Sequence, residues 1–182
     1  MDRDTALDLL KSNVKNKNLV KHCFACEAVL GALAKRLGEA EETWRLAGLL
    51  HDIDYDKTSD SPQEHARIGG EMLREAGVDS QIVHAVLAHN DHVTRESALD
   101  KALWCVDPLS GLIVAAALIR SEKKLSAIDT QFVLNRMKEK SFARGANREQ
   151  IRACEQELGL TLEEFVTIGL KAMQDISDDL GL

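Results

Sequence analysis

The segment Leu49-Leu50-His51-Asp52-Ile53-Asp54 places a histidine directly before an aspartate at the end of an apolar run. An imidazole supplies one nitrogen ligand to a metal, and a carboxylate supplies one or two oxygens that can bridge two ions. Neighbouring side chains on a helix point about 100° apart, so both can reach a metal only beyond the end of the helix. The dipeptide alone is a weak signal, and its meaning depends on the rest of the chain.

Composition indicates an all-α protein. Of the 182 residues, 45% are hydrophobic, aromatic residues make up 4%, and only two are Pro. Good helix formers dominate, and no stretch shows the alternating pattern of a strand bounded by turn residues. A chain of this length is expected to form one domain with a sizeable core. The sequence therefore predicts a single helical domain over residues 1–182, without a sheet.

Charge and targeting signals narrow the class of protein. The net charge of −7 argues against a general nucleic-acid binder, which normally carries a basic face, although it leaves room for a nucleotide held by metal ions. No apolar segment follows Met1-Asp2-Arg3-Asp4, so no signal peptide is expected. The longest apolar run, residues 109–119, is too short to cross a bilayer. These features predict a cytoplasmic protein with reduced cysteines and no membrane segment.

Helical periodicity and capping residues predict a series of helices. The expected bounds are about 4–10, 18–37, 41–52, 62–76, 80–89, 96–107, 109–120, 129–140, 147–158 and 161–180. Ser61-Pro62-Gln63-Glu64 has the pattern of a capping box that opens the fourth of these helices after a polar loop. Because Pro108 disfavours helical backbone at Asp107, we expect a kink or a break there.

Six residues with metal-binding side chains lie on five successive predicted helices, at or near a buried face or a helix end: His22, His51, Asp52, His65, His89 and Asp107. A polar side chain on an apolar face is costly unless it is paired or binds a metal. For any one of these histidines, a hydrogen-bonded core residue is the usual explanation. Five helices in succession are harder to explain that way, because packed helices bring their inward side chains to one point.

The order of these residues resembles the HD-domain superfamily of metal-dependent phosphohydrolases. The pattern of that family, a His, then His-Asp, then a distant Asp, falls on His22, His51, Asp52 and Asp107, and the contexts in residues 47–53 and 101–107 are similar. Residues 65–70 and 85–89 resemble the segments that add two histidines in the binuclear branch, here His65 and His89. The resemblance covers about residues 18–120 and leaves about 121–182 as a C-terminal helical extension.

The resemblance implies a hydrolytic metal site. His22, His51, Asp52 and Asp107 would hold one ion, and His65 and His89 a second, with Asp52 bridging and His51-Asp52 as the catalytic pair. Mixed imidazole and carboxylate ligands suit Mn, Fe, Co, Ni or Zn, with Mg as a further option. A metal-activated water would then attack a phosphate ester of a nucleotide or another small phosphorylated metabolite. The expected partner is thus a small molecule, with no general nucleic-acid binding.

A non-catalytic helical module, which uses the metal for structure or for sensing a nucleotide, is the alternative. Structural sites are usually closed by four protein ligands, often cysteines. Six candidate ligands and a possible bridging carboxylate therefore favour the enzyme. Cys23 and Cys26 have the spacing of a redox or zinc pair, but no second pair completes a zinc site, and small core residues are the simpler interpretation.

Other polar residues have two interpretations each. His84 leaves the face shared by its neighbours and is expected at the surface, while Asp91 and His92 follow a helix end and fit a loop better than a ligand set. Lys57 and Arg67 are ordinary surface cations unless they meet a substrate phosphate. Lys138, Lys140 and Arg144 form a basic stretch around Phe142, which is usually a solvated helix end but could fold over the site and contact phosphate.

Overall fold

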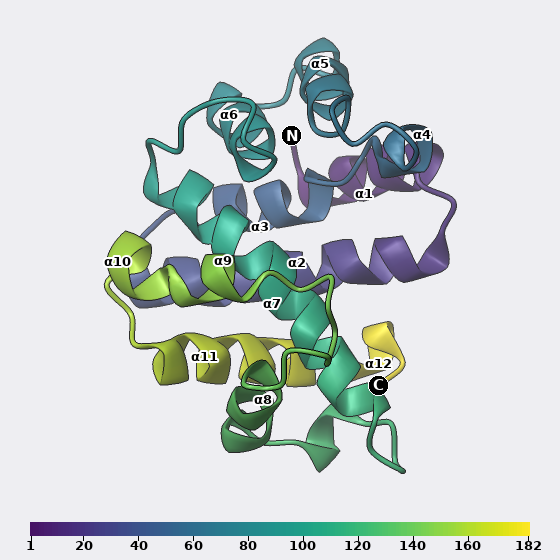
Figure 1. Ribbon diagram of the computed structural model, residues 1–182. Helices are drawn as coiled ribbons and strands as arrows, with labels where there is room; N and C mark the ends of the chain where they lie inside the picture. Colours follow the sequence, from purple (N-terminus) through teal and green to yellow (C-terminus); the bar gives the residue numbers. More distant parts are fainter.

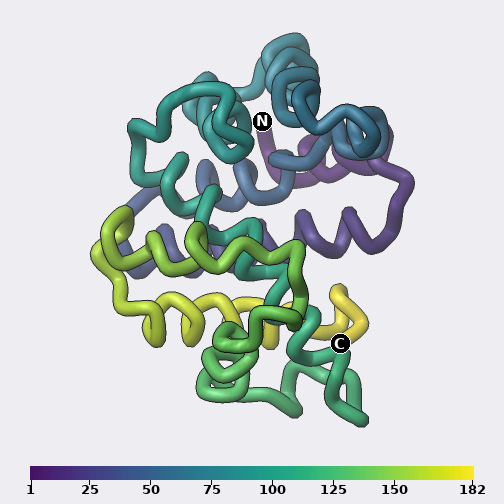
Figure 2. The backbone as a smooth tube through the Cα atoms, viewed as in Figure 1, coloured from purple at the N-terminus to yellow at the C-terminus, as the bar shows by residue number.

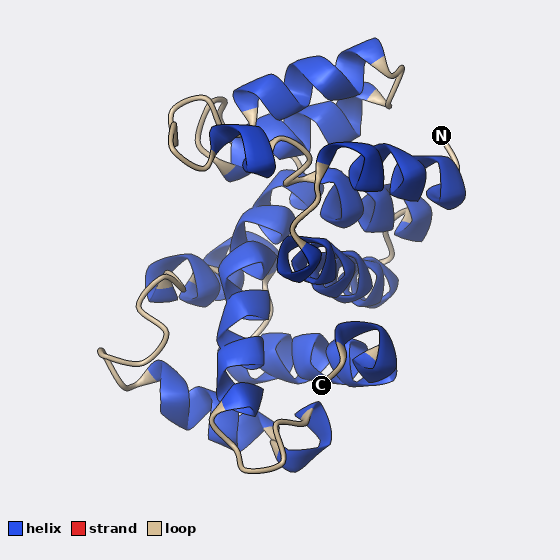
Figure 3. Ribbon diagram, turned by 90° about the vertical axis from the view of Figure 1, so that its right-hand side faces the viewer, coloured by secondary structure: helices blue, strands red, loops and turns tan.

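The computed structural model describes all residues, Met1–Leu182, and contains helices but no strand (Figures 1 and 3), so the all-α prediction is confirmed. The helices are α1 Arg3–Asn13, α2 Lys17–Leu37, α3 Glu41–Leu50, α4 Tyr55–Thr58, α5 Arg67–Glu75, α6 Ser80–His89, α7 Ala98–Leu118, α8 Thr130–Met137, α9 Arg148–Arg152, α10 Cys154–Leu158, α11 Leu162–Asp175 and α12 Ser177–Leu180, with a 3-10 turn, η1, at Leu125–Ala127.

Helices α2 and α3 form the most closely packed pair of helices in the fold. Gly48 of α3 lies against the backbone of α2, and a Cβ built on it would come 2.6 Å from the carbonyl carbon of Cys26. Only glycine allows two helix backbones to approach so closely. This contact fixes the end of α3 over α2, and it thereby sets the position of His51 relative to His22.

Helix α7 crosses α2 and runs through the molecule as one continuous helix of 21 residues (Figure 1). The expected break before Pro108 is therefore wrong. A proline inside a helix removes one backbone hydrogen bond, but residues on both sides of Pro108 are buried in the core, and this packing outweighs the local preference. Asp107 stays in helical register as a result. Helix α7 begins two residues later than predicted, after a capping box formed by Ser97 and Asp100.

The segment between α3 and α5 differs from the prediction. The expected loop contains a short helix, α4, and the expected helix from Pro62 begins only at Arg67. Ala66 has a left-handed backbone with φ of 65°, which an α-helix cannot include. Asn90 donates to the carbonyl oxygens of Pro62 and His65 and stabilises this non-helical turn.

The C-terminal helices complete the core. Figure 2 shows the chain after α7 folding back, so that α11 lies along α2, while α9 and α10 pack across α7. The predicted helix 147–158 is divided into α9 and α10 at Ala153, and the predicted helix 161–180 into α11 and α12 at Ile176. The buried apolar residues form one cluster that extends from Ala6 to Leu180.

One helix, α7, is long and apolar enough by length and composition to cross a membrane. Most of its apolar window is buried inside the fold, and the core helix of a soluble protein passes the same test. Its apolar residues are accounted for by packing against α2, α6 and the C-terminal helices.

Candidate metal centre

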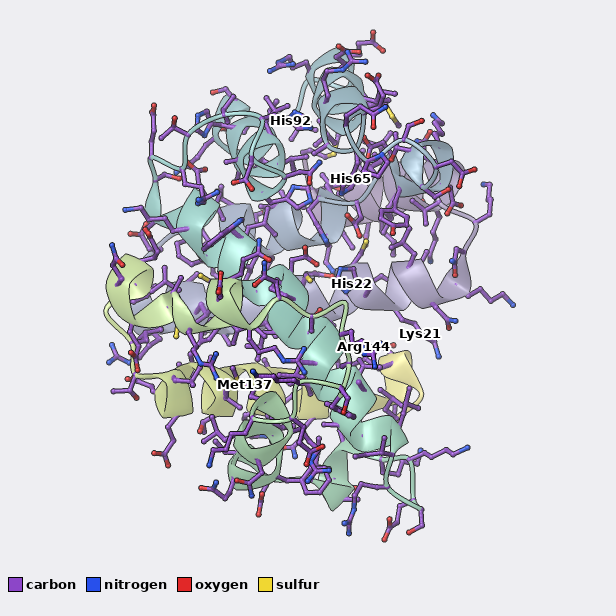
Figure 4. The ribbon with its side chains drawn as sticks, in the orientation of Figure 1. Lys21, His22, His65, His92, Met137 and Arg144 are labelled. Carbon is purple, nitrogen blue, oxygen red and sulfur yellow. The ribbon has the colours of Figure 1, made fainter.

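The predicted ligand residues meet around the carboxylate of Asp52. This side chain is only 6% exposed and follows directly on the end of α3. His22 comes from α2, His65 from the turn before α5, and both are labelled in Figure 4. The six residues predicted from the sequence thus lie in one site, although they come from five different parts of the chain.

One oxygen of Asp52 faces a first donor group, made of His22, His51 and Asp107. Oδ2 of Asp52 lies 3.5 Å from Nε2 of His22 and 3.4 Å from Nε2 of His51. The two Nε2 atoms are 3.2 Å apart, and Oδ1 of Asp107 lies 3.1 Å from Nε2 of His22. Two nitrogens and two carboxylate oxygens therefore gather around one point.

The other oxygen of Asp52 faces a second donor group, made of His65 and His89. Oδ1 lies 3.3 Å from Nε2 of His65 and 3.8 Å from Nε2 of His89. These two nitrogens are 3.3 Å apart. Asp52 therefore stands between two groups of donors and presents a different oxygen to each.

The outer nitrogen of each histidine has its own hydrogen-bond acceptor. Nδ1 of His51 donates to the carbonyl oxygen of Gly48 at 2.8 Å, and Nδ1 of His89 donates to that of Val86. Nδ1 of His65 donates to Oδ1 of Asp54 at 2.9 Å. With the proton on Nδ1, each ring directs the lone pair of Nε2 toward Asp52.

His22 follows the same rule through Ser110. The hydroxyl of Ser110 donates to the carbonyl oxygen of Asp107 at 2.9 Å, so its own oxygen accepts from Nδ1 of His22 at 3.0 Å. Each of the four imidazoles therefore has an acceptor for a proton on Nδ1, so Nε2 can bind a cation once it has lost any proton of its own. Such outer hydrogen bonds are typical of histidines that ligate metals.

Asp54 is a fully buried supporting residue. Its Oδ2 accepts from the backbone N–H of Gly69 at 2.7 Å, while Oδ1 binds His65. A Cβ on Gly69 would lie 3.2 Å from Cγ of Asp54, so glycine at this position allows the carboxylate to approach α5 closely. Asp54 thus ties the turn that carries His65 to the first turn of α5.

The electrostatics of the site favour a cation beside Asp52. Burial would raise the pKa of Asp52, but the surrounding imidazoles, His51 first, lower this pKa well below its usual range. Burial would also lower the pKa of His65, yet hydrogen bonds to Asp52 and Asp54 raise it to about 9. Burial, followed by the charge of His51, lowers the pKa of His89 to about 4. Asp52 is therefore an anion at neutral pH.

These donors fit a divalent metal. His51, Asp52 and His89 offer three ligand atoms within 4.8 Å of one another, and all three residues are buried. Two Nε2 atoms about 3 Å apart are compatible only with a proton or a cation between them, and a divalent metal can take the place of that proton. This arrangement occurs twice, once in each donor group, and the donor chemistry is that of a transition-metal site.

The centre lies at the base of a polar cleft of about 550 Å³. Asn16, Asn18, Leu19, His22, Asp52, Tyr55, His65, His89, Asn90, Asp107 and Gln150 line it. Serine, threonine and cysteine are all absent from these residues, so the cleft offers no aliphatic hydroxyl or thiol as a nucleophile. Tyr55 is 41% exposed and packs edge-to-face on His65, leaving part of its ring open to the cleft.

The remaining candidates lie outside the two donor groups. His84 pairs with Oδ2 of Asp100 at 3.0 Å, and His92 donates to the carbonyl oxygen of His65 at 2.6 Å. Lys57 donates to the side chain of Asn13, and Arg67 pairs with Glu64 and Glu71, so neither cation points into the cleft. Cys23 and Cys26 are buried and free. Lys138, Lys140 and Arg144 line a different cavity.

Two supporting residues, Asp54 and Ser110, were missed in the sequence. Ser110 is three residues after Asp107 on one helix, a spacing that puts both on the same face and could have indicated it. Asp54 comes two residues after Asp52 in a segment that reads as a polar loop, and no sequence signal shows that its carboxylate is buried.

Comparison with known proteins identifies the family. The model for the HD domain matches residues 19–141. Ribonuclease Y of Oleidesulfovibrio alaskensis is 31% identical over 137 residues, which are 74% of this chain and 26% of that protein. Ribonuclease Y of Cutibacterium acnes is 29% identical over 115 residues, 63% of this chain and 21% of that protein. The chain thus spans between a fifth and about a quarter of the length of these relatives. No solved structure matches it.

The names of these relatives contradict one prediction. A small-molecule substrate with no general nucleic-acid binding was expected from the net charge of −7. Net charge is a sum over the whole surface, however, and it cannot exclude a local basic region beside an anionic substrate. The family match over residues 19–141, together with the convergence of its sequence pattern on Asp52, shows that the chain belongs to the HD-domain superfamily of metal-dependent phosphohydrolases.

Proposed function

We propose that the chain is a metal-dependent phosphodiesterase that hydrolyses RNA. One observation carries the proposal: the two carboxylate oxygens of Asp52 face two separate groups of imidazole donors. A carboxylate in this position can bridge two ions, and two neighbouring ions are a common arrangement in enzymes that cleave phosphate esters.

Each ion has its own ligands in this proposal. His22, His51, Asp107 and Asp52 would hold one ion, and His65 and His89 would hold the other together with Asp52. The mixture of nitrogen and oxygen donors suits Mn, Fe, Co, Ni or Zn better than Ca, which prefers oxygen alone. The exposed mouth of the cleft leaves room for water and a phosphate at the ions.

A divalent ion bound here lowers the pKa of its water and balances the charge on a phosphoryl group, as hydrolysis of a phosphodiester requires. The protein side chains fix the ligands for this chemistry. The four Nδ1 hydrogen bonds hold each imidazole in one orientation. Because Asp52 is buried, bulk water does not compete with a metal for its carboxylate oxygens. The cleft lining contains no serine or cysteine that could form a covalent intermediate, so water is the expected nucleophile.

RNA as the substrate is supported by two independent points. The relatives that match over much of this chain are named ribonuclease Y. The cleft combines the exposed face of Tyr55 with the side-chain amides of Asn16, Asn18, Asn90 and Gln150. An aromatic face can stack on a base, and amides can hydrogen-bond to base edges and ribose hydroxyls.

The test is metal analysis followed by RNA cleavage. Purified protein would be stripped with chelator, reloaded with Mn²⁺, Ni²⁺, Zn²⁺ or Mg²⁺, and assayed on a labelled single-stranded oligoribonucleotide and on bis(4-nitrophenyl) phosphate. We expect close to two ions per chain and metal-dependent hydrolysis of both substrates. The Asp52→Ala protein should lose both properties.

Two results would contradict the proposal. One is a wild-type protein that binds metal and RNA without cleaving either substrate, which would favour the non-catalytic module. The other is an Asp52→Ala protein that keeps full metal content and turnover. Far-UV circular dichroism of the variant would show that a loss of activity is not a loss of the fold.

A further inference from the structure

A second polar cavity, of about 590 Å³, lies in the C-terminal part of the chain and is strongly basic. We call it the basic pocket, and its lining consists of Met137, Lys138, Lys140, Arg144, Gly145, Ala146, Asn147, Arg148 and Arg152. Five of these residues are cations and none is acidic. Such a concentration of positive charge is unexpected in a chain with a net charge of −7.

The cations of the basic pocket are available for an external anion. Lys138, Lys140, Arg144 and Arg152 are exposed, and none of them has a carboxylate within 4.0 Å. Elsewhere on the surface, cations such as Arg67 and Lys171 are paired with neighbouring acids. An unpaired group of cations around one hollow has the composition expected of a phosphate-binding surface.

The fifth cation, Arg148, holds the pocket in shape. Its guanidinium donates to the carbonyl oxygens of Phe142, Ala143 and Ala146, and so it ties the loop after α8 to the start of α9. Ala143 has a left-handed backbone with φ of 41°, which these contacts maintain. The loop is therefore a built feature that fixes the backbone from which Lys140 and Arg144 project.

The basic pocket and the metal cleft share helix α9. Gln150 of α9 lines the cleft, while Arg148 and Arg152 of the same helix line the basic pocket. Figure 4 labels Met137 at the end of α8 and Arg144 in the loop that follows, and both line the pocket. Residues two apart on a helix point to nearly opposite sides, so the two cavities open on opposite sides of α9, and a helix with its side chains is about 10 to 12 Å across.

We infer that the basic pocket binds backbone phosphates of the same RNA strand whose scissile phosphate enters the metal cleft. This inference rests on the proposed function and adds to it the path of the strand across α9. A stacked strand advances about 3.4 Å per nucleotide, so roughly three to four nucleotides cross α9. The pocket lies largely beyond residues 19–141, the segment matched by the family model, and belongs to this chain's own C-terminal region.

The test compares strand lengths in a double variant, Lys140→Gln/Arg144→Gln. Both residues are exposed and neither lies in the metal centre. The matched control is Lys123→Gln/Lys124→Gln, which removes two exposed cations outside the pocket and gives the same net charge. Metal-loaded proteins would be titrated by fluorescence anisotropy with phosphorothioate oligoribonucleotides of roughly three and roughly twelve nucleotides, which keep their charge and resist hydrolysis.

We expect the double variant to bind the longer strand roughly 25-fold more weakly near 0.1 M salt, because each phosphate contact contributes roughly a factor of five by counterion release. The slope of log affinity against log salt should fall by about 1.4. Affinity for the shorter strand should stay the same, as should hydrolysis of bis(4-nitrophenyl) phosphate. The control variant should behave like wild type with both strands.

The outcomes separate this inference from the proposed function. If the double variant binds the longer strand as tightly as the control does, the pocket does not contact RNA, and the hydrolytic proposal is untouched. If the pocket instead retains inorganic phosphate while RNA affinity is unchanged by the substitutions, it is a free-anion site and the strand assignment is wrong. If wild type cleaves nothing, yet its RNA binding depends on Lys140 and Arg144, the proposed function fails and the pocket stands.

Discussion

The two donor groups around Asp52 are built on different kinds of backbone. The first group projects from regular helices: His22 from α2, His51 from the end of α3, and Asp107 from the middle of α7. In the second group, His89 ends α6, but His65 lies in a turn before α5 whose next residue, Ala66, has a positive φ. The first group depends on helix packing, whereas the second depends on whatever holds that turn.

The supporting hydrogen bonds differ in the same way. In the first group, Nδ1 of His51 and of His22 donate to a carbonyl oxygen and to the neutral hydroxyl of Ser110. In the second group, Nδ1 of His65 donates to the charged carboxylate of Asp54, which also accepts from Gly69. Hydrogen bonds to a charged acceptor are roughly twice as strong as neutral ones. The side chain of Asp54 therefore fixes the position of His65, whereas helix packing fixes the position of His22.

The largest effect is expected at the residue that both groups share. Asp52→Ala removes the carboxylate that faces both donor groups, so metal content should fall from about two ions toward none. Activity should fall by more than the roughly 10- to 100-fold typical of losing a supporting residue. Metal analysis by mass spectrometry and the RNA assay would measure both. His51→Ala should also abolish activity, and retention of one tight ion by Asp52→Ala would break the bridging assignment.

Removing one histidine of the second group should cost the protein one ion and leave the other bound. His65→Ala or His89→Ala should lower the stoichiometry from two ions toward one, because the first group keeps its own ligands and Oδ2 of Asp52. His84→Ala is the control, since this side chain pairs with Asp100 and does not reach Asp52. A wild-type protein that binds a single ion, or a His84→Ala protein that loses one, would contradict this division.

Asp54→Asn tests whether the turn before α5 depends on one carboxylate. The amide has one carbonyl oxygen in place of two carboxylate oxygens, so it cannot accept from both His65 and Gly69. We expect affinity for the second ion to fall about 10- to 100-fold while the first is unchanged. Calorimetric metal titration would resolve the two ions. Asp60→Asn, an exposed neighbour, is the matched control, and equal effects of both substitutions would remove Asp54 from the site.

Sequence patterns predicted the parts of this site that are determined within single helices. Helical spacing placed His22, His89 and Asp107 on inward faces, and the structure brings them together with His51-Asp52; that they bind metal remains a prediction. Sequence patterns gave wrong predictions where a contact with a distant part of the chain determines the local backbone. The capping residues at Ser61 indicated a helix, but contacts from Asn90 hold that segment as a turn. Pro108 indicated a break, but burial on both sides keeps α7 continuous.

Asp54 and the loop of the basic pocket were beyond prediction for the same reason. The carboxylate of Asp54 is defined by Gly69 on a helix 15 residues away. Three of the five cations of the basic pocket, Lys138, Lys140 and Arg144, stood out as a basic stretch in the sequence. The fold of their loop, however, depends on Arg148 and three carbonyl oxygens. Net charge was a poor guide to nucleic-acid binding because a sum over the chain takes no account of where cations gather on the surface.

The smallest effect is expected at Ser110, the neutral partner in the first group. Ser110→Ala removes the acceptor for Nδ1 of His22, but α2 still positions the ring, and Asp107 still contacts Nε2. We expect affinity for the first ion to fall by about tenfold, the lower end of the range for supporting residues, and less than Asp54→Asn lowers the second. The substitution is best measured in the His65→Ala background, where one site remains and the titration reports it alone. Ser121→Ala, an exposed serine, is the control. An effect of Ser110→Ala as large as that of Asp54→Asn would show that the first group also depends on one hydrogen bond rather than on helix packing.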